Sequence, residues 1–166
     1  MEARNGIQLY LLRHADAGDP EAWSGPDEER PLSDKGRRQS ERLAAFLAGL
    51  RFRPDLIATS PKLRARETAD IVAAALGLPV VSDDLLAGSV DYREVDAILE
   101  AHGRPAKAVL VGHDPDFSEL LSGLVGAGDI SMKKGALARV DVVRGIQAGG
   151  GALRWLIPPD ALKGRD

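Results

Sequence analysis

Two histidines of this chain follow apolar runs, at positions where a strand would end. His14 stands beside Arg13 directly after the run 7–12, and His113 follows the run 108–111 through one glycine. In a parallel sheet the carboxyl ends of neighbouring strands meet at one edge, and ligands bind in the crevice beyond them. We therefore expect Arg13 and both histidines to share one site.

A third polar segment, Ser60 to Arg64, follows the short apolar run 55–59. Helical side chains lean toward the N-terminus, so Arg64 can reach back over the start of the helix expected here. Two arginines offer planar forks for phosphate oxygens, and helix N-termini add N–H donors. In such a site one neutral histidine can attack phosphorus while the other stabilises charge on the phosphoryl oxygens. These residue types predict a site for a dianionic phosphoryl group.

Apolar runs and helical patterns alternate along the chain, which is the order of an α/β protein. A strand buried on both faces of a sheet has a continuous apolar run, and 7–12 is of this kind. The order predicts one domain, residues 1–166, with a mostly parallel central sheet, helices on both faces and an antiparallel edge. The expected strands are 7–12, 55–59, 78–81, 107–111, 136–142 and 152–157. The expected helices are 33–50, 60–77, 91–102 and one from 114 that contains 120–124.

Cap signals indicate where these helices begin. Ser33 is a suitable N-cap, and Ser60-Pro61 and Asp114-Pro115 each resemble a cap followed by proline at the first helical position. On this interpretation Ser60 is a helix cap and not a nucleophile.

Four ordered blocks carry a resemblance that covers the chain from Leu9 to about Leu124. They are LYLLRHADAG, RPLSDKGRRQSERL, SPKLRARETA and VLVGHDPDFSELL. Together they resemble the histidine phosphatase superfamily in its short, SixA-like branch. The resemblance implies that His14 is the phosphorylated nucleophile, that Arg13 and Arg64 clamp the phosphoryl group, and that His113 completes the pocket. It implies no metal and no other cofactor.

The chain departs from the family pattern at two places. Ala15 stands where glycine often follows the nucleophile, and it still keeps the side chain small. The general acid has no unique match, because the segment SDDLLAGSVDYRE holds four carboxylates. Asp84 most nearly resembles the acidic position of the branch and is the first candidate for the catalytic acid. Asp16, beside the nucleophile, is the second.

Three functions are compatible with these residues. The first is hydrolysis of phosphohistidine on a signalling or phosphotransfer protein, with inorganic phosphate as product. It is favoured because the chain between Leu76 and Lys107 has room for no lid domain, and because imidazole is a good leaving group that tolerates a poorly defined acid. The second is a phosphatase for a small phosphomonoester or nucleotide. The third is a noncatalytic phosphate-binding adaptor, which the intact arginines and histidines disfavour.

Composition excludes several other classes. The 166 residues include no cysteine, so thiolate catalysis and disulfides are ruled out. The formal net charge is -3, which gives no reason to expect a nucleic-acid partner. The sequence shows no signal peptide or membrane span, so we expect a cytoplasmic protein that does not contact a membrane. The charged run 27–30 and the cluster Lys35, Arg37 and Arg38 are interpreted as solvated surface.

Overall fold

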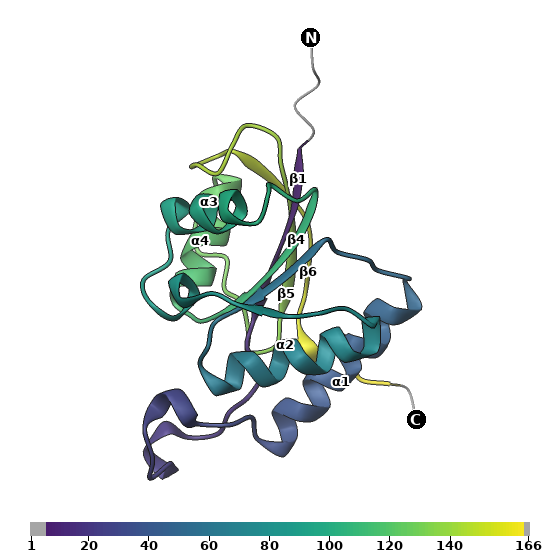
Figure 1. Ribbon diagram of the computed structural model, residues 1–166, viewed down its shortest axis with the longest axis vertical. Helices are drawn as coiled ribbons and strands as arrows, with labels where there is room; N and C mark the ends of the chain where they lie inside the picture. Colours follow the sequence, from purple (N-terminus) through teal and green to yellow (C-terminus); the bar gives the residue numbers. More distant parts are fainter. Residues whose placement is uncertain (1–5, 165–166) are drawn as a thin grey trace.

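The computed structural model describes residues 6–164 and contains one six-stranded sheet in the order β3-β2-β4-β1-β5-β6 (Figure 1). The strands are β1 (Ile7–Arg13), β2 (Leu56–Thr59), β3 (Val81–Ser82), β4 (Lys107–Gly112), β5 (Leu137–Val142) and β6 (Gly151–Ile157). The α-helices are α1 (Asp34–Gly49), α2 (Leu63–Leu76), α3 (Tyr92–Ala101) and α4 (Asp116–Val125). Short 3-10 helices are η1 (Pro20–Ala22), η2 (Asp27–Glu29), η3 (Asp84–Ala87) and η4 (Pro159–Leu162).

The sheet is parallel through its first four strands and antiparallel at its other edge. β1 pairs with β4, β4 with β2, and β2 with β3, all parallel, whereas β5 runs antiparallel to both β1 and β6. In the registers of β1 and β2 against β4, Arg13 lies beside Gly112 and Thr59 beside Val111. The three strands therefore end level with one another, and the residues that follow them emerge at one edge.

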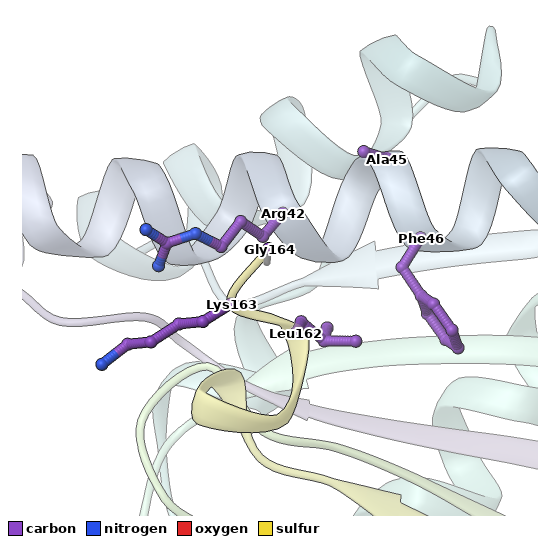
Figure 2. A pocket seen from close by; sticks show the side chains of 6 residues that line it. All are labelled: Arg42, Ala45, Phe46, Leu162, Lys163 and Gly164. Atoms are coloured by element: carbon purple, nitrogen blue, oxygen red, sulfur yellow. The ribbon is translucent and has the colours of Figure 1, made fainter. Parts of the chain in front are cut away.

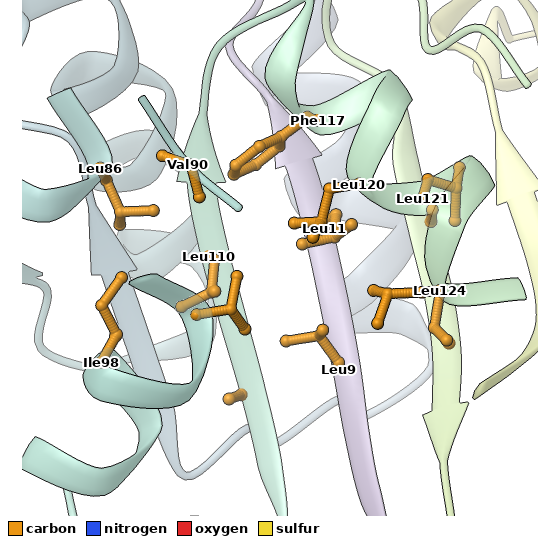
Figure 3. Packing of buried hydrophobic residues seen from close by; sticks show 14 of the residues in the cluster. Leu9, Leu11, Leu86, Val90, Ile98, Leu110, Phe117, Leu120, Leu121 and Leu124 are labelled. Atoms are coloured by element: carbon orange, nitrogen blue, oxygen red, sulfur yellow. The ribbon is translucent and has the colours of Figure 1, made fainter. Parts of the chain in front are cut away.

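Helices cover both faces of the sheet, α3 and α4 on one side and α1 and α2 on the other (Figure 1). On the first face Leu9 and Leu11 of β1 belong to one buried cluster with Leu110 and the leucines of α4 (Figure 3). On the second face Tyr10 and Leu12 of β1 belong to a cluster with α1 and α2. Alternate side chains of one strand thus anchor both helical layers, which explains the continuous apolar run. Between residues 6 and 164, no helix has the length and apolar character that a membrane span requires.

The predicted α/β fold is confirmed, with its parallel core and antiparallel edge. Three local predictions are wrong. Helix α2 begins at Leu63 with Lys62 as its N-cap, so Ser60 does not cap it. Helix α4 begins at Asp116 after Pro115, one position later than the Asp114 cap predicted. The third strand is the two-residue β3 and not 78–81, because its pairing with β2 is limited to two positions.

The first turn of helix α1 packs against the segment that follows His14. Ser33 caps the helix by accepting from the amide of Gly36, and the Ser33 amide donates to the Asp16 carbonyl at 3.0 Å. A Cβ atom at Gly36 would lie 1.9 Å from that same carbonyl oxygen. Gly36 is therefore required by close approach of two backbone segments, because side chains essentially never come so near.

Replacing Gly36 with alanine should destabilise the protein although alanine is the better helix former. The clash with backbone should cost about 1–3 kcal/mol, which outweighs a propensity gain of about 1 kcal/mol. Gly49→Ala is the matched control, since nothing lies within 4 Å of a Cβ at that end of the same helix. Urea unfolding should show a lower midpoint for Gly36→Ala and an equal or higher one for Gly49→Ala. Equal midpoints would show that the backbone at Asp16 can move away from the added Cβ without a cost in stability.

Candidate active site

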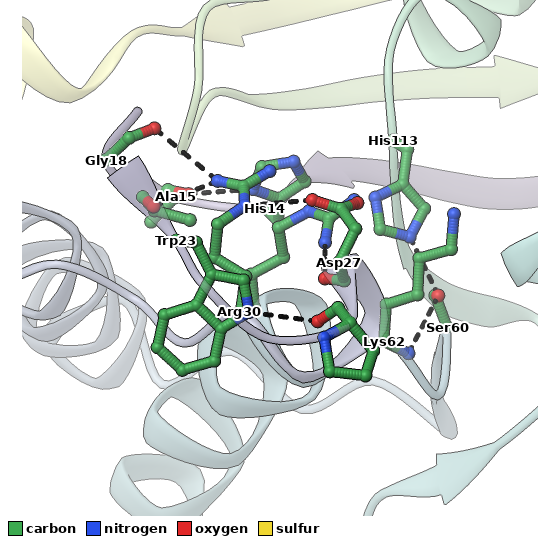
Figure 4. Close-up of polar contacts among 12 residues, drawn as sticks. His14, Ala15, Gly18, Trp23, Asp27, Arg30, Ser60, Lys62 and His113 are labelled. Carbon is green, nitrogen blue, oxygen red and sulfur yellow. Dashed lines mark hydrogen bonds and ion pairs between the residues drawn. The ribbon is translucent and has the colours of Figure 1, made fainter. Parts of the chain in front are cut away.

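Three loops bring the predicted site residues together at the carboxyl edge of β1, β2 and β4. The ring of His14, directly after β1, lies with its centroid 5.2 Å from that of His113, which follows β4. Ser60 follows β2, and Arg64 is the second residue of α2. Figure 4 shows both histidines facing the same small space. The sequence prediction that these segments converge agrees with this geometry.

The ring of His14 is neutral, and one of its nitrogens has a lone pair that is not used in a hydrogen bond within the described residues. Its Nδ1 lies 2.7 Å from the Ala15 carbonyl oxygen, and because a carbonyl can only accept, Nδ1 carries the proton. Burial, with the positive charges of Arg64 and Arg13, lowers the pKa of His14 to about 4. The ring is therefore uncharged at neutral pH, and Nε2 keeps its lone pair. This is the form of histidine that can attack an electrophile.

The backbone at His14 and Ala15 is fixed by hydrogen bonds from three segments. The amide of His14 donates to the Gly112 carbonyl at 2.9 Å, and its own carbonyl accepts from the amide of Gly135 at 3.0 Å. The amide of Ala15 donates to the hydroxyl of Thr68 at 3.1 Å, and that hydroxyl donates to the Arg64 carbonyl at 2.7 Å. Thr68 thus couples the positions of His14 and Arg64.

Arg64 is anchored along one edge of its guanidinium by Asp27. Nη1 donates to the Asp27 carbonyl at 2.9 Å, and Nη2 pairs with the Asp27 carboxylate at 3.0 Å. Only 8% of the Arg64 side chain is exposed. Its Nε is buried without a hydrogen-bond partner in the described chain. The edge formed by Nε and Nη2 therefore retains donors for a bound anion.

Arg13 is held in a similar way from the other side. Its Nη1 donates to the Met132 carbonyl at 2.7 Å and lies 3.4 Å from the Asp114 carboxylate. Its Nε is also buried and unpartnered among residues 6–164. As in Arg64, one guanidinium nitrogen is bound by the protein, here Nη1, while the N–H of Nε has no partner within the described residues.

His113 is oriented by Ser60. The ring nitrogen Nε2 lies 2.8 Å from the Ser60 hydroxyl, which accepts from the amide of Lys62 at 3.2 Å. When the hydroxyl hydrogen points at Nε2, the ring proton lies on Nδ1, which can then donate to an anion. Burial lowers the pKa of His113 to about 3, together with the charge that His14 acquires when it is protonated and the charge of Arg64. Its Nδ1 is buried and has no partner in the part of the chain that the structure describes.

The unsatisfied polar atoms of the protein are concentrated in this site. Within residues 6–164, the buried side-chain nitrogens or oxygens that lack a partner are Arg13 Nε, Arg64 Nε and His113 Nδ1. An unmade hydrogen bond of a buried group costs about 1–3 kcal/mol, so such groups call for an explanation. Three donors around a neutral histidine would be satisfied by the oxygens of one tetrahedral oxyanion. Besides burial, the charges of both arginines lower the pKa of His14, and its ring lies 5.2 Å from that of His113, so these groups lie near one another and could hold an anion together.

Sequence reasoning missed the part played by the charged run at Asp27. Asp27 pairs with Arg30 at 3.0 Å as well as with Arg64, and Arg30 is 7% exposed, so the interpretation of this run as solvated surface is wrong for Arg30. Arg30 also donates to the Ala17 carbonyl at 2.9 Å and so ties the loop together (Figure 4). The spacing of Asp27 and Arg30 allows a local pair, but no local signal connects either residue to Arg64.

The two candidate acids lie in different surroundings. Asp84 begins η3, is exposed, and forms no hydrogen bond or ion pair with the site residues within the described chain. Asp16 is partly buried, which raises its pKa, but bonds from Ser33 and Gly18 and the charge of Lys134 outweigh burial and lower the pKa overall. That environment favours the carboxylate, whereas a general acid needs the protonated form. The assignment of the acid stays a prediction.

Fold and site together define an α/β protein that can hold a tetrahedral oxyanion against a neutral histidine. Residues 9–90 match the histidine phosphatase superfamily (branch 1). A protein of Picosynechococcus, itself described as uncharacterized, is 37% identical over 68% of this chain and 70% of its own length. The chain belongs to the histidine phosphatase superfamily, as the four ordered blocks predicted.

Two further comparisons concern proteins named SixA. The phosphohistidine phosphatase SixA of Escherichia coli is 29% identical over 95% of this chain and 97% of its own length. The structure of the protein histidine phosphatase SixA complexed with tungstate superimposes with a TM-score of 0.79 and 28% identity, covering 95% of this chain and all of that one. The likeness to SixA thus extends over nearly the whole fold.

The two site histidines should titrate far below the usual value for histidine. In the folded protein we expect His14 and His113 to remain neutral down to about pH 5, whereas in urea both should titrate near pH 6.5. Because both folded pKa values lie below the unfolded value, their contribution to stability is complete above about pH 6.5 and is lost as pH falls to about 4 for His14 and about 3 for His113. Ring nitrogen NMR spectra, assigned with His113→Asn, measure both midpoints. A folded midpoint near 6.5 for His14 would contradict the burial argument.

Proposed function

We propose that this protein is a phosphohistidine phosphatase that carries the phosphoryl group on His14. One observation carries the proposal: among residues 6–164, the buried side-chain nitrogens that lack a partner belong to Arg13, Arg64 and His113, whose charges or ring lie close to His14. They supply donors for the equatorial oxygens of a phosphoryl group in transfer, where charge stabilisation is the main demand.

In the first step Nε2 of His14 attacks phosphorus as the N–P bond of the substrate breaks. The electron pair of that bond leaves with the substrate imidazole, which takes up a proton from solvent or from an acid such as Asp84. Nδ1 of His14 keeps its proton on the Ala15 carbonyl, so the ring becomes a cationic phosphohistidine without losing its orientation. Arg13, Arg64 and His113 hold the phosphoryl oxygens throughout.

In the second step water attacks phosphorus and the bond to His14 breaks. Inorganic phosphate forms, the water proton passes to solvent or phosphate, and Nε2 recovers its lone pair. The low pKa of His14 supports this step, because a ring that resists a positive charge is a good leaving group. The cycle closes with a neutral His14 ready for the next substrate.

The surroundings of the pocket favour a phosphohistidine on another protein over a small phosphate ester. The segment between α2 and β4 contains β3, η3 and α3, and the buried face of α3 packs into the core with Val95, Ile98 and Leu99. It therefore covers the sheet and forms no separate lid domain. A site without a lid domain suits a side chain that projects from a macromolecule, and the imidazole leaving group tolerates an undefined acid.

The relatives support the same substrate class. The Escherichia coli relative is named a phosphohistidine phosphatase, and the similar solved structure holds tungstate, a tetrahedral oxyanion. By this proposal the partner is a phosphohistidine-bearing protein in the cytoplasm and the product is inorganic phosphate.

The nucleophile is tested by trapping the intermediate. His14→Ala should fold normally, because its core neighbours are unchanged, and should lose essentially all turnover of a phosphohistidine protein. Wild-type enzyme quenched during turnover should carry acid-labile, base-stable phosphate on His14. His102→Ala is the control, since His102 lies at the C-terminal end of α3, and should keep both activity and label.

Other results would select the alternatives. Phosphate found on Ser60, or full activity of His14→Ala, would overturn the mechanism. Turnover of phosphomonoesters or nucleotides without turnover of phosphohistidine would assign the second function. No turnover of any substrate, including an aryl phosphate, would indicate a binding adaptor.

The clamp is tested by changing fork geometry while keeping the charge. Arg64→Lys cannot donate simultaneously to Asp27 and to a phosphoryl oxygen in the same plane, so kcat/KM should fall at least ~10-fold, about 1.4 kcal/mol. Arg66→Lys is the matched control on the same helix, because Arg66 pairs with exposed Asp70 at 3.1 Å. Its kcat/KM should stay within about twofold of wild type. Equal losses in both variants would refute the assignment of Arg64 to the phosphoryl group.

A further inference from the structure

A continuous band of positive side chains leads away from the anion pocket. We call it the basic trough. It starts at Arg13, crosses the exposed side of α1 and ends at the C-terminal segment after η4. Its cationic members are Arg13, Lys35, Arg38, Arg42, Lys133, Lys134 and Lys163.

Three adjoining hollows make up the trough. The first, about 370 Å³, opens beside Arg13 and is lined by Lys133, Lys134 and Lys35. The second, about 300 Å³, shares Lys35 with the first. The third, about 700 Å³, shares Arg42 and Lys163 with the second. The shared side chains join the hollows into one depression, and Arg13, at its start, is the residue that it has in common with the site.

The trough is strongly positive although the whole protein is acidic. Its lining contains seven cationic and two anionic side chains, whereas the chain has a formal net charge of -3. The anionic members are already paired, Asp16 with Lys134 at 3.6 Å and Asp160 with Lys163 at 3.4 Å. Among residues 6–164, no ion pair within 4.0 Å is formed by Lys35, Arg38, Arg42 or Lys133. Arg13 is paired with Asp114 at 3.4 Å, so four cationic members are left without a carboxylate partner in the described chain, and their charge attracts an acidic ligand.

The length of the trough indicates how long a ligand it could hold. Lys35 and Phe46 are eleven residues apart on one helix, which corresponds to about 16 Å. A phosphoryl group fills only the pocket at one end. At the far end the lining becomes apolar, with Phe46 and Leu162 on the side opposite the charged heads of Arg42 and Lys163 (Figure 2). An extended acidic segment that carries an apolar side chain matches both the charge and the span.

We propose that the basic trough docks an acidic surface segment of the phosphohistidine-bearing protein. The inference rests on the proposed function for the identity of the partner, and it adds the surface by which that partner is recognised. The trough steers the acidic partner to the pocket and holds it while its phosphohistidine reaches His14, and so acts on KM more than on kcat. Lys134 lines the basic trough and also acts on the site, because its charge helps to lower the pKa of His14.

The experiment compares two double charge reversals with equal change in net charge. Arg38→Glu with Lys163→Glu reverses two exposed members of the trough. Arg93→Glu with Arg144→Glu is the control, since both residues are exposed, at the start of α3 and in the β5–β6 turn. The substrates are a strongly acidic histidine-containing phosphotransfer protein, phosphorylated with phosphoramidate, and the free amino acid phosphohistidine.

On the protein substrate the trough variant should show kcat/KM at least ~10-fold below wild type, mostly through KM, while the control variant stays within about twofold. Both variants should hydrolyse free phosphohistidine at the wild-type rate. Raising the salt from about 50 mM to about 500 mM should remove most of the difference, because exposed charges are screened.

Three results would overturn the docking proposal. One is an unchanged KM of the trough variant for the protein substrate. Another is an equal loss on free phosphohistidine, which would mean that the reversals disturb the pocket. The third is a selective loss on a nucleoside triphosphate, which would assign the trough to a polyphosphate chain.

A binding measurement separates this proposal from the proposed function. Calorimetric titration of the unphosphorylated acidic protein into His14→Ala enzyme needs no turnover. Binding that disappears in the trough variant and persists in the control supports docking even if the wild-type enzyme fails to hydrolyse phosphohistidine. If the acidic protein does not bind to His14→Ala enzyme while the wild-type enzyme hydrolyses phosphohistidine normally, the docking role of the trough is refuted. The proposed function is then unaffected.

Discussion

The site depends on holding two buried guanidinium groups by part of their donors while leaving the rest unused. Asp27 takes one edge of Arg64, and the carbonyl of Met132 with the carboxylate of Asp114 takes Arg13. Without these anchors each charge would be buried with no partner, which is among the costliest arrangements in a protein. With them, each Nε is left as a donor that has no partner among residues 6–164. The pocket is thus organised before any anion arrives, so little reorganisation is needed when charge develops on the phosphoryl oxygens.

Burial raises the free energy of the charged arginines, and the same burial keeps the two histidines neutral. Desolvation is the largest cause of the low pKa of both His14 and His113, and the neighbouring cations add to it. A histidine that stays neutral at neutral pH keeps a lone pair on one ring nitrogen, which is what the role proposed for His14 requires. Burying these charged and polar groups costs free energy. The two apolar clusters on either side of β1 offset that cost, because they contribute most of the favourable burial.

Charge is distributed unevenly over the molecule, and the distribution follows the chemistry. Inside the pocket the positive groups are anchored and few, because each must be matched in geometry to one phosphoryl group. Outside it, along the basic trough, they are exposed and numerous, which suits attraction over a distance and tolerates variation in the partner. The chain is acidic as a whole, so the trough and the pocket together form a positive region on a negative background.

The sequence by itself determined the alternation of strands and helices, the edge at which the site lies, and the candidates His14, Arg13, Arg64 and His113. These follow from local signals, since apolar runs and helical periods are set by neighbours within a few residues. The contacts that organise the site are not local. Arg64 meets Asp27 across 37 positions and Arg13 meets Met132 across 119.

Tertiary structure alone decided those pairings, the start of α2 at Leu63, and the role of Ser60 as the partner of His113. Ser60 has the residue type and position of a helix cap, and no pattern in the sequence states that β4 will place a histidine 2.8 Å from its hydroxyl. The basic trough is likewise assembled from α1, the lysines at 133–134 and the C-terminal segment. Such features depend on which surfaces pack together, and packing is a property of the whole chain and not of any window within it.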